Sequence, residues 1–459
     1  MNGYFKKMIV VTILVGIGYV ATAQKVIQKK PEASIPYTLR IDKNISDSAL
    51  VDLVQKQTLR YFWDFAHPTS GLARERSNVT AAHGHEVVTT GGAGFGVMAI
   101  LVGVNRNWIE RDTAARFFLK MVKWLSKADA YHGVFAHWLH GETGKTIPFS
   151  RKDDGADLVE TSFLMQGLLC VRQYFDGDDP VERQLRNRIN SLWNEVEWDF
   201  YTREGREVLY WHWSPNNGWA MNFPLRGFNE CLITYVLAAS STRFPVSEKI
   251  YHRGWAQSSF FKNGRMFYNY LLPLGFDYGG PLFFSHYSFL GLNPKGLKDR
   301  YADYWQQNQN HSLINYSYCV DNPKAFKGYG SNCWGLTASD DPNGYDAHSP
   351  TNDNGTITPT AALSAFPYTP EQSIKALRYY YTQLGDKIWG EYGFTDAFNL
   401  TKNWYATSYL AIDQGPIVVM IENYRTGLLW NLFMSCPEVQ QGLKKLGFES
   451  KNLSRVPAL

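Results

Sequence analysis

Residues 149–169, FSRKDDGADLVETSFLMQGLL, lead from a group of acidic side chains into a helix that is apolar on nearly every side. The acids are Asp153, Asp154, Asp157 and Glu160. Carboxyl groups are rarely buried unless they are paired, so this arrangement indicates either a salt-bridge cluster or a site of proton chemistry. If the helix starts near Gly155, Asp157 lies in its first turn and Glu160 follows at i+3 on the same face.

Similar apolar stretches recur along the chain and alternate with one-faced ones. Helices apolar all round are expected at 92–104, 158–171, 228–239, 358–365 and 417–434. One-faced helices are expected at 50–65, 114–125, 181–196, 247–260, 297–309 and 370–384. A helix that is apolar all round is buried, whereas a one-faced helix covers it. The pattern predicts an all-α (α/α)6 toroid, a double barrel of inner and outer helices with long loops forming a cleft at one end.

The N-terminus has the pattern of a secretory signal peptide. Lys6 and Lys7 precede an apolar run, and Ala21-Thr22-Ala23 forms a cleavage pattern before Gln24. We therefore expect a signal peptide at residues 1–23, an extended lead-in at 24–45 and one domain at 46–459. The apolar run is short for a membrane span, so we expect a periplasmic protein without a stable span after cleavage, and a monomer.

Composition favours a sugar-binding cleft over a nucleic-acid surface. The chain has 46 Lys and Arg against 42 Asp and Glu, so it lacks the excess of basic residues typical of a nucleic-acid-binding protein. Charged residues make up 19% of the chain and aromatic residues 15%. Flat aromatic side chains suit the C–H faces of sugar rings, so the aromatic surplus predicts a lined cleft.

Two further acids stand at the starts of apolar helices. Glu230 follows Arg226 and Asn229, and a Glu in an apolar environment can have a raised pKa and act as a general acid. An Arg226–Glu230 ion pair at i, i+4 is the alternative. Asp413 precedes Gly415 and Pro416 and is either a site acid or a plain N-cap.

Capping is also an alternative for the acids around residue 157, since carboxylates satisfy free N–H groups at helix starts. Glu160 argues against it, because we expect it to lie a turn inside the helix. Candidate sugar-binding residues are Arg76, His137, Trp138, Trp213, Trp219, Arg226, Asn229 and Trp334.

Other motifs predict little. The GGAGFG motif at 91–96 lacks the strand and Lys of a nucleotide-binding loop, and the His pairs 83/85 and 137/140 lack zinc-site spacing. The acidic loop at 341–353 does not fit a twelve-residue calcium loop, and no G-x-S-x-G appears. We expect no metal and no cofactor. Cys319 and Cys333 are candidates for a disulfide, which sequence alone cannot decide.

Three segments carry a family resemblance: GADLVETSFLMQGLL at 155–169, RGFNECLITYVLAAS at 226–240 and YLAIDQGPIVVMIENYRTGLLWNLF at 409–433. They resemble the glucoamylase-like helical-barrel glycoside hydrolases, most closely the β-1,2-glucanase branch, glycoside hydrolase family 144. The resemblance implies an (α/α)6 fold and inverting hydrolysis of β-1,2-glucan to sophorose or sophorooligosaccharides. It assigns the proton donor to Glu230 and places Asp153, Asp157 and Glu160 in or beside the cleft.

The resulting hypothesis is that Glu230 protonates the glycosidic oxygen. A carboxylate of the Asp153, Asp157 and Glu160 group, or Asp413, then activates a water on the opposite face of the sugar. Inversion requires the two carboxyl groups to stand roughly 6.5–9.5 Å apart. A periplasmic glucan-binding protein without catalysis and a polysaccharide lyase on the same fold remain alternatives.

Overall fold

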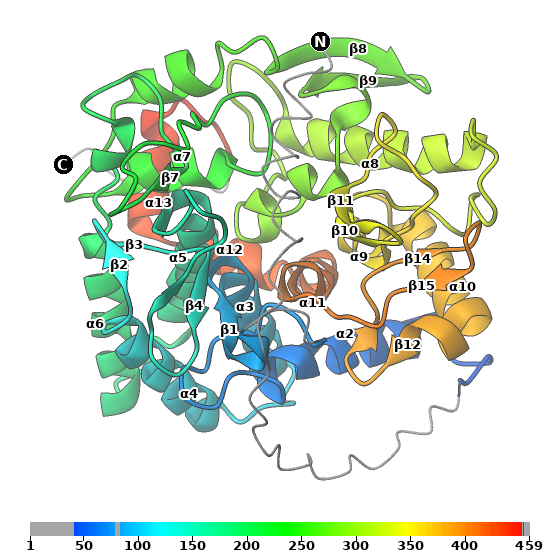
Figure 1. Cartoon of the computed structure of the whole chain (residues 1–459), viewed down its shortest axis with the longest axis horizontal. Coiled ribbons are helices and arrows are strands. Elements are labelled where there is room, and N and C mark those ends of the chain that lie inside the picture. The colour runs from blue at the N-terminus through cyan, green and yellow to red at the C-terminus, as the bar shows by residue number, and fades with distance from the viewer. Residues whose placement is uncertain (1–40, 79–82, 452, 454–459) are drawn as a thin grey trace, which may run out of the picture.

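The computed structural model describes residues 41–78, 83–451 and 453 and shows two layers of helices around a common centre (Figure 1). The inner helices are α3 (Thr90–Asn105), α5 (Leu158–Tyr174), α7 (Leu232–Ser240), α9 (Pro359–Ser364) and α11 (Ala411–Arg425). The outer helices are α2 (Asp47–Trp63), α4 (Arg111–Leu125), α6 (Pro180–Glu195), α8 (Tyr304–Asp321) and α10 (Pro370–Ile388). Two more, α12 (Leu428–Met434) and α13 (Pro437–Lys445), follow α11. The alternation of buried and one-faced helices confirms the predicted (α/α)6 toroid.

The inner layer closes through neighbouring contacts. Helix α3 packs between α5 and α11, α5 also contacts α7, and α11 contacts α9. The remaining inner place holds two short 3-10 turns, η5 (Leu282–Ser285) and η6 (Ser288–Leu290). The π-helical turn η3 (Ile250–Trp255) packs on α7, where the rings of Trp255 and Tyr235 are in contact. One inner place is therefore filled by short turns instead of a helix.

The strands are short and all their pairings are antiparallel. They are β1 (Val87–Thr89), β2 (Ala130–Tyr131), β3 (Val134–Phe135), β4 (Trp138–His140), β5 (Thr146–Ile147), β6 (Ala156–Asp157), β7 (His212–Trp213), β8 (Lys262–Phe267), β9 (Tyr270–Leu274), β10 (Ala338–Asp341), β11 (Gly344–Ala347), β12 (Trp389–Gly390), β13 (Gly393–Phe394), β14 (Phe398–Asn399) and β15 (Trp404–Tyr405). β1, β4 and β5 form a three-stranded sheet, and the others pair two by two. Three turns remain: η1 (Gly84–Glu86), η2 (Phe200–Thr202) and η4 (Asp277–Gly279). The strands lie in the loops between helices, and β1, β4, β6, β7, β10 and β11 contribute residues to the cavity described below.

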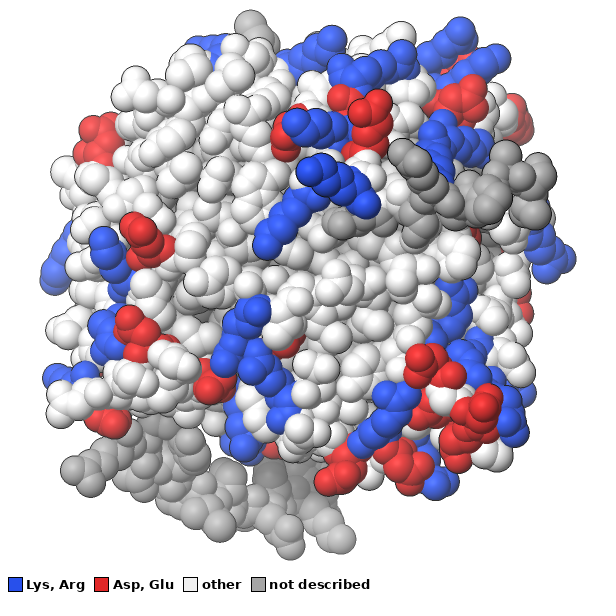
Figure 2. All heavy atoms as spheres, turned by 180° about the vertical axis from the view of Figure 1, so that it is seen from behind, with Lys and Arg blue, Asp and Glu red and all other residues white. Residues whose placement is uncertain are grey.

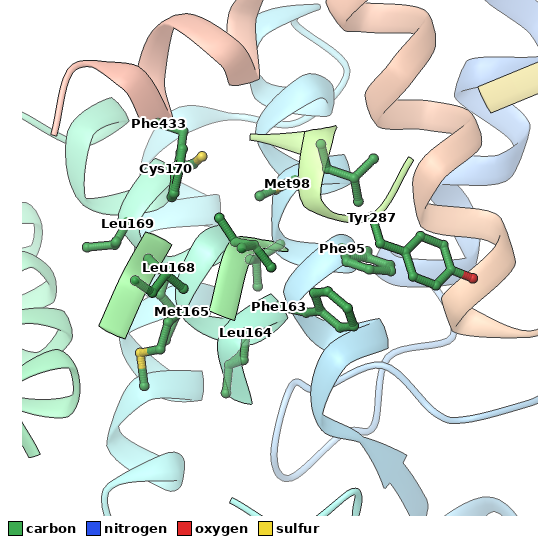
Figure 3. Close-up of a cluster of buried hydrophobic side chains, with 14 of the residues drawn as sticks. Phe95, Met98, Phe163, Leu164, Met165, Leu168, Leu169, Cys170, Tyr287 and Phe433 are labelled. Carbon is green, nitrogen blue, oxygen red and sulfur yellow. The ribbon is translucent and has the colours of Figure 1, made fainter. Parts of the chain in front are cut away.

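Glycines let α3 and α5 approach closely. A Cβ on Gly94 would lie 2.2 Å from the carbonyl oxygen of Phe163, and a Cβ on Gly167 would lie 2.3 Å from that of Gly94. Beside this crossing, Phe95 of α3, Phe163 of α5 and Tyr287 gather in one cluster (Figure 3). The glycine-rich motif therefore serves helix packing, because a side chain at Gly94 would clash with the α5 backbone.

Several predicted helix bounds were wrong. The 417–434 helix is two helices, because Gly427 takes a left-handed conformation (φ 73°) between α11 and α12. The helix predicted at 297–309 begins at Tyr304, where the Asp303 side chain accepts the N–H groups of Trp305 and Gln306. The 247–260 helix shrinks to η3, and the 228–239 helix begins only at Leu232.

All five cysteines are free and buried, so the predicted candidate disulfide between Cys319 and Cys333 is not formed. The signal peptide expected at 1–23 and most of the lead-in lie outside the described residues. Within the part of the chain that the structure describes, no helix combines the length and apolarity needed to cross a membrane.

Candidate active site

A cavity of about 410 Å³ opens where the inner helices begin. It is lined by residues at or just before the starts of α3, α5, α7 and α11, which confirms that the helix entrances share a cleft. Its acidic lining residues are Glu75, Asp153, Asp157, Glu160, Glu230 and Asp346. Its aromatic lining residues are Trp138, Phe149, Phe163, Trp211, Phe223, Phe283, Phe284, Tyr287 and Tyr345. Arg76, His137, His212 and Asn229 complete most of the polar surface.

Asp157 is the anchor of the site. It is the N-cap of α5, and its Oδ1 accepts hydrogen bonds from the N–H groups of Val159 (3.1 Å) and Glu160 (2.9 Å) and from Trp211 Nε1 (2.8 Å). Its Oδ2 lies 3.1 Å from His137 Nδ1. Burial alone would raise the pKa of Asp157, but the His137 contact and these donors hold that pKa below its usual value. The capping alternative is therefore correct for Asp157, which also faces the cavity.

His137 lies between β3 and β4 and faces the acids. Burial lowers its pKa, yet Glu160 and the hydrogen bond with Asp157 outweigh burial and raise the pKa of His137 to about 9. The ring also packs on Phe149, with centroids 4.4 Å apart. A protonated His137 therefore stabilises the negative charge in this part of the cavity.

Glu160 lies in the first turn of α5, not a turn inside the helix as predicted, because α5 starts at Leu158. Its Oε2 accepts the N–H of Gly91 at 2.8 Å, so Glu160 caps the neighbouring helix α3. Burial, together with the charges of Asp157 and Asp153, raises the pKa of Glu160 to about 7. A carboxyl group with this pKa can exchange a proton near neutral pH.

Asp153 reaches the cavity from the loop before β6. The antiparallel pairing of β6 with β7 sets Asp157 opposite His212, and His212 Nε2 lies 3.4 Å from Asp153 Oδ2. Burial raises the pKa of Asp153. Asp153, Asp157 and His212 form the group of described residues whose donor atoms, within 4.8 Å of one another, could hold a metal ion.

Glu230 lies just before α7 and is 9% exposed. Its Oε2 has no hydrogen-bond partner among the described residues, and the Arg226 guanidinium donates to the carbonyl oxygen of Gly254 instead. The predicted Arg226–Glu230 pair is absent because α7 begins after Glu230, so the two residues do not share a helix face. Burial and the nearby Glu160 and Asp157 raise the pKa of Glu230 to about 7. Glu230 is therefore a cavity acid that can carry a proton at neutral pH.

Asp413 does not line the cavity. It lies in the first turn of α11, after Leu410 as N-cap, so it is not the N-cap that the alternative proposed. It is 2% exposed and borders Asp396, and burial raises the pKa of Asp413 to about 8.

The predicted sugar-binding residues divide into two groups. Arg76, His137, Trp138 and Asn229 line the cavity. Trp213, Trp219, Arg226 and Trp334 do not. Successive side chains of a strand face opposite sides, so His212 of β7 faces the cavity and Trp213 packs on His132 instead.

The other three residues lie elsewhere for separate reasons. Trp219 packs on Phe200. Arg226 is exposed. Trp334 is fully buried in the core.

Sequence reasoning considered the segment with Trp211 and His212 but chose only Trp213 from it. It missed other lining residues: Glu75, Phe223, Phe283, Phe284, Tyr287, Tyr345 and Asp346. Trp211 and His212 adjoin the predicted Trp213, so the predicted segment reaches the cavity through neighbouring residues. Tyr345 and Asp346 lie on β11 in the acidic loop considered for calcium, where Asp341 accepts the Asn343 N–H and the Asn354 side chain. That loop is therefore a hairpin that forms one wall of the cavity.

Comparisons with known proteins agree with this architecture. A family model described as "Putative glucoamylase" matches residues 222–437. The exo beta-1,2-glucooligosaccharide sophorohydrolase (non-reducing end) of Parabacteroides distasonis is 47% identical over 423 residues, which are 88% of this chain and 58% of that protein. The chain thus spans less than two thirds of the length of this curated relative.

Solved structures give the same result. The endo-beta-1,2-glucanase from Chitinophaga pinensis, in complex with sophorotriose and glucose, is 56% identical with a TM-score of 0.87, covering 89% of this chain and 100% of that one. The beta-1,2-glucanase from Parabacteroides distasonis is 46% identical with a TM-score of 0.85, covering 88% and 60%. The chain belongs to the glucoamylase-like family of helical-barrel glycoside hydrolases, in its β-1,2-glucanase branch.

Proposed function

We propose that the protein hydrolyses β-1,2-glucan with inversion and releases sophorose or sophorooligosaccharides. The observation that carries this proposal is Glu230, a buried carboxyl group on the cavity wall with a raised pKa and an unpartnered oxygen. Such a group can donate a proton to a glycosidic oxygen at neutral pH. The β-1,2 linkage is proposed because the relatives are named as enzymes that act on β-1,2-linked glucans. The aromatic lining of the cavity suits sugar rings.

The second role needs an acid whose oxygens are still free to hold a water. Asp157 fits poorly, because its Oδ1 already accepts three hydrogen bonds. Among the described residues, the carboxylate of Asp153 lies against His212, and that of Glu160 accepts the N–H of Gly91. In our proposal Asp153 or Glu160 activates the water, and Asp157 orients His137.

The two alternatives fit the site less well. A glucan-binding protein without catalysis would pair its acids with Arg or Lys, yet of the described cavity acids only Glu75 has such a partner, Arg76. A lyase acting on uronic acids would need a basic cavity, and acids dominate this one.

The test is incubation of the purified protein with linear β-1,2-, β-1,3- and β-1,4-glucans, with product sizes followed over time. We expect cleavage of β-1,2-glucan alone; sophorose from the start would mean exo action and a ladder would mean endo action.

Glu230→Gln should lower kcat by about 10³-fold or more, because an amide cannot donate the acid proton. Glu204→Gln, at an exposed position, is the matched control and should keep full activity. Normal hydrolysis by Glu230→Gln would end the proposal.

We also propose export to the periplasm and a monomeric state. Support for export comes from the charged, apolar and A-x-A pattern at residues 1–23. Cell fractionation with N-terminal sequencing tests the first proposal, and light scattering of the purified protein tests the second.

A further inference from the structure

A tyrosine of the cavity wall, Tyr287, has a ring that its neighbours fix in place. It lies between η5 and η6, lines the cavity and is 6% exposed. Its ring stacks on that of Phe283, with centroids 4.9 Å apart. It also meets the rings of Phe95, at 4.9 Å, and Phe163, at 5.7 Å (Figure 3). Three aromatic contacts leave the ring little freedom to turn.

The backbone of this turn is fixed by α5. The side-chain amide of Gln166, which is fully buried, donates from Nε2 to the carbonyl oxygen of Tyr287 at 3.1 Å. Its Oε1 accepts the N–H of Gly291, also at 3.1 Å. One side chain therefore holds both ends of the turn, so the position of the Tyr287 hydroxyl is set before a ligand binds.

The next residue, Ser288, joins the turn to Glu230. Its Oγ donates to the carbonyl oxygen of Glu230 at 2.5 Å and accepts the N–H of Ile233 at 3.0 Å. The N-cap residue of α7, Cys231, provides no side-chain cap of its own. Ser288 thus caps α7 from a distant segment of the chain, which keeps Tyr287 and Glu230 in a constant relation to each other.

The hydroxyl group of Tyr287 differs from other tyrosine hydroxyls in the core. Tyr61 donates to the carbonyl oxygen of Arg74 at 2.9 Å, and Tyr235 donates to that of Leu225 at 2.7 Å. The Tyr287 hydroxyl makes no hydrogen bond with a described residue, and it points away from its neighbouring phenylalanines (Figure 3). A hydroxyl that faces a cavity from a fixed ring obtains its partner from what enters the cavity.

This hydroxyl keeps its proton at neutral pH. Burial raises the pKa of Tyr287 well above its usual value, and the nearby carboxyl groups of Asp413, Glu160 and Glu230 act in the same direction. A neutral phenol donates one hydrogen bond and can accept another, which suits an uncharged hydroxyl group of a sugar.

We propose that the Tyr287 hydroxyl binds a hydroxyl group of the glucosyl unit next to the bond that Glu230 protonates. The inference rests on the proposed function and adds a substrate-binding residue to it. A β-1,2-linked glucan keeps free hydroxyl groups on every unit, so a partner is always present. Because Ser288 ties the turn to the Glu230 carbonyl, a sugar that Tyr287 holds is positioned against the acid.

The first test measures binding without cleavage. Tyr287→Phe removes the hydroxyl and keeps every ring contact, so it should fold like the wild type, which thermal unfolding checks. In proteins that also carry Glu230→Gln, calorimetry with sophorotriose should give a Kd about tenfold higher for Tyr287→Phe, the loss expected for one hydrogen bond to an uncharged ligand. Tyr424→Phe in the same background is the matched control. Its ring is 46% exposed near the end of α11, and its Kd should stay within about twofold.

The second test uses Tyr287→Phe with Glu230 intact. Its kcat/KM for β-1,2-glucan should fall about tenfold, while the pH at which kcat/KM declines stays that of the wild type. A purely structural effect that displaced Glu230 would move this pH, because burial is what raises the pKa of Glu230. A shift of about one pH unit or more would therefore overturn the binding role.

Values of Kd and kcat/KM for Tyr287→Phe within about twofold of those for Tyr424→Phe also overturn the inference. The proposed function fails separately. If the wild type binds sophorotriose but cleaves no β-glucan, the hydrolase assignment is wrong, and the Kd comparison still decides the role of Tyr287. If it neither binds sophorotriose nor cleaves a β-glucan, both are wrong.

Discussion

At the residue scale, two carboxyl groups of the cavity have pKa values raised to about 7, and they differ in their partners. Glu160 accepts the Gly91 N–H, whereas Glu230 Oε2 has no donor among the described residues. An unpartnered buried carboxyl group is stable only while it is protonated, because burial penalises its charged form. Glu230 is thus suited to the role of acid, and Glu160 both caps a helix and faces the cavity.

This difference predicts the alkaline limb of the activity profile. The acid form of Glu230 is complete below its pKa of about 7 and is lost above it, so kcat/KM should fall about tenfold per pH unit above that value. Initial rates at low substrate between pH 5 and 9 measure this limb. A kcat/KM that stays level up to pH 9 would contradict the assignment of the acid to Glu230.

The residue scale also shows what the sequence predicts well. Asp153, Asp157, Glu160 and Glu230 stood out as acids next to apolar helices, and the structure brings them to one cavity. Tyr345 and Asp346 carried no such signal, because a hairpin residue faces a distant cavity only through tertiary packing. Trp334 was predicted to bind sugar, but this Trp in a loop-rich segment is buried in the core.

At the element scale, hydrophobic periodicity predicted the long helices and failed where local turns interrupt them. The buried helices α3 and α5 follow directly from their apolar sequences. Between α11 and α12 the chain breaks at Gly427, which takes a left-handed conformation. The apolar periodicity continues across this glycine, so the sequence pattern predicted one helix. The short turns η5 and η6 take the place of an inner helix and pack against α7, α8 and α11, so they depend on tertiary contacts that a local sequence pattern does not show.

The crossing of α3 and α5 yields an element-scale prediction. In Gly94→Ala the new methyl group would meet the backbone of Phe163, which cannot move aside as a side chain could. We expect a loss of stability of about 1–3 kcal/mol or more, measured by urea unfolding. Gly330→Ala is the control, because its added methyl meets open space. Equal stability of the two variants would mean that the helices separate at little cost.

At the scale of the whole molecule, the net charge is small, and on the face seen in Figure 2 basic and acidic side chains are interspersed. The face opposite to that of Figure 1 shows Lys and Arg side chains beside Asp and Glu, without a field of one sign (Figure 2). The formal net charge of the full chain is +4. Inside the cavity, acids predominate and Arg76 is held by Glu75 and Asp340. Neither this face nor the cavity is therefore arranged to attract an anionic polymer.

This distribution predicts how binding responds to salt. A neutral glucan gains nothing from long-range attraction, so its KM should change less than about twofold between roughly 0.05 and 0.5 M NaCl, a range over which the Debye length shortens several-fold. An anionic polysaccharide bound through basic groups would instead lose affinity steeply as salt screens the attraction. Initial rates against glucan concentration at several ionic strengths make the measurement, with the folded state checked by circular dichroism at each one. A KM that rises tenfold with salt would show that the cavity recognises a charged polymer, and the neutral-glucan assignment would then be wrong.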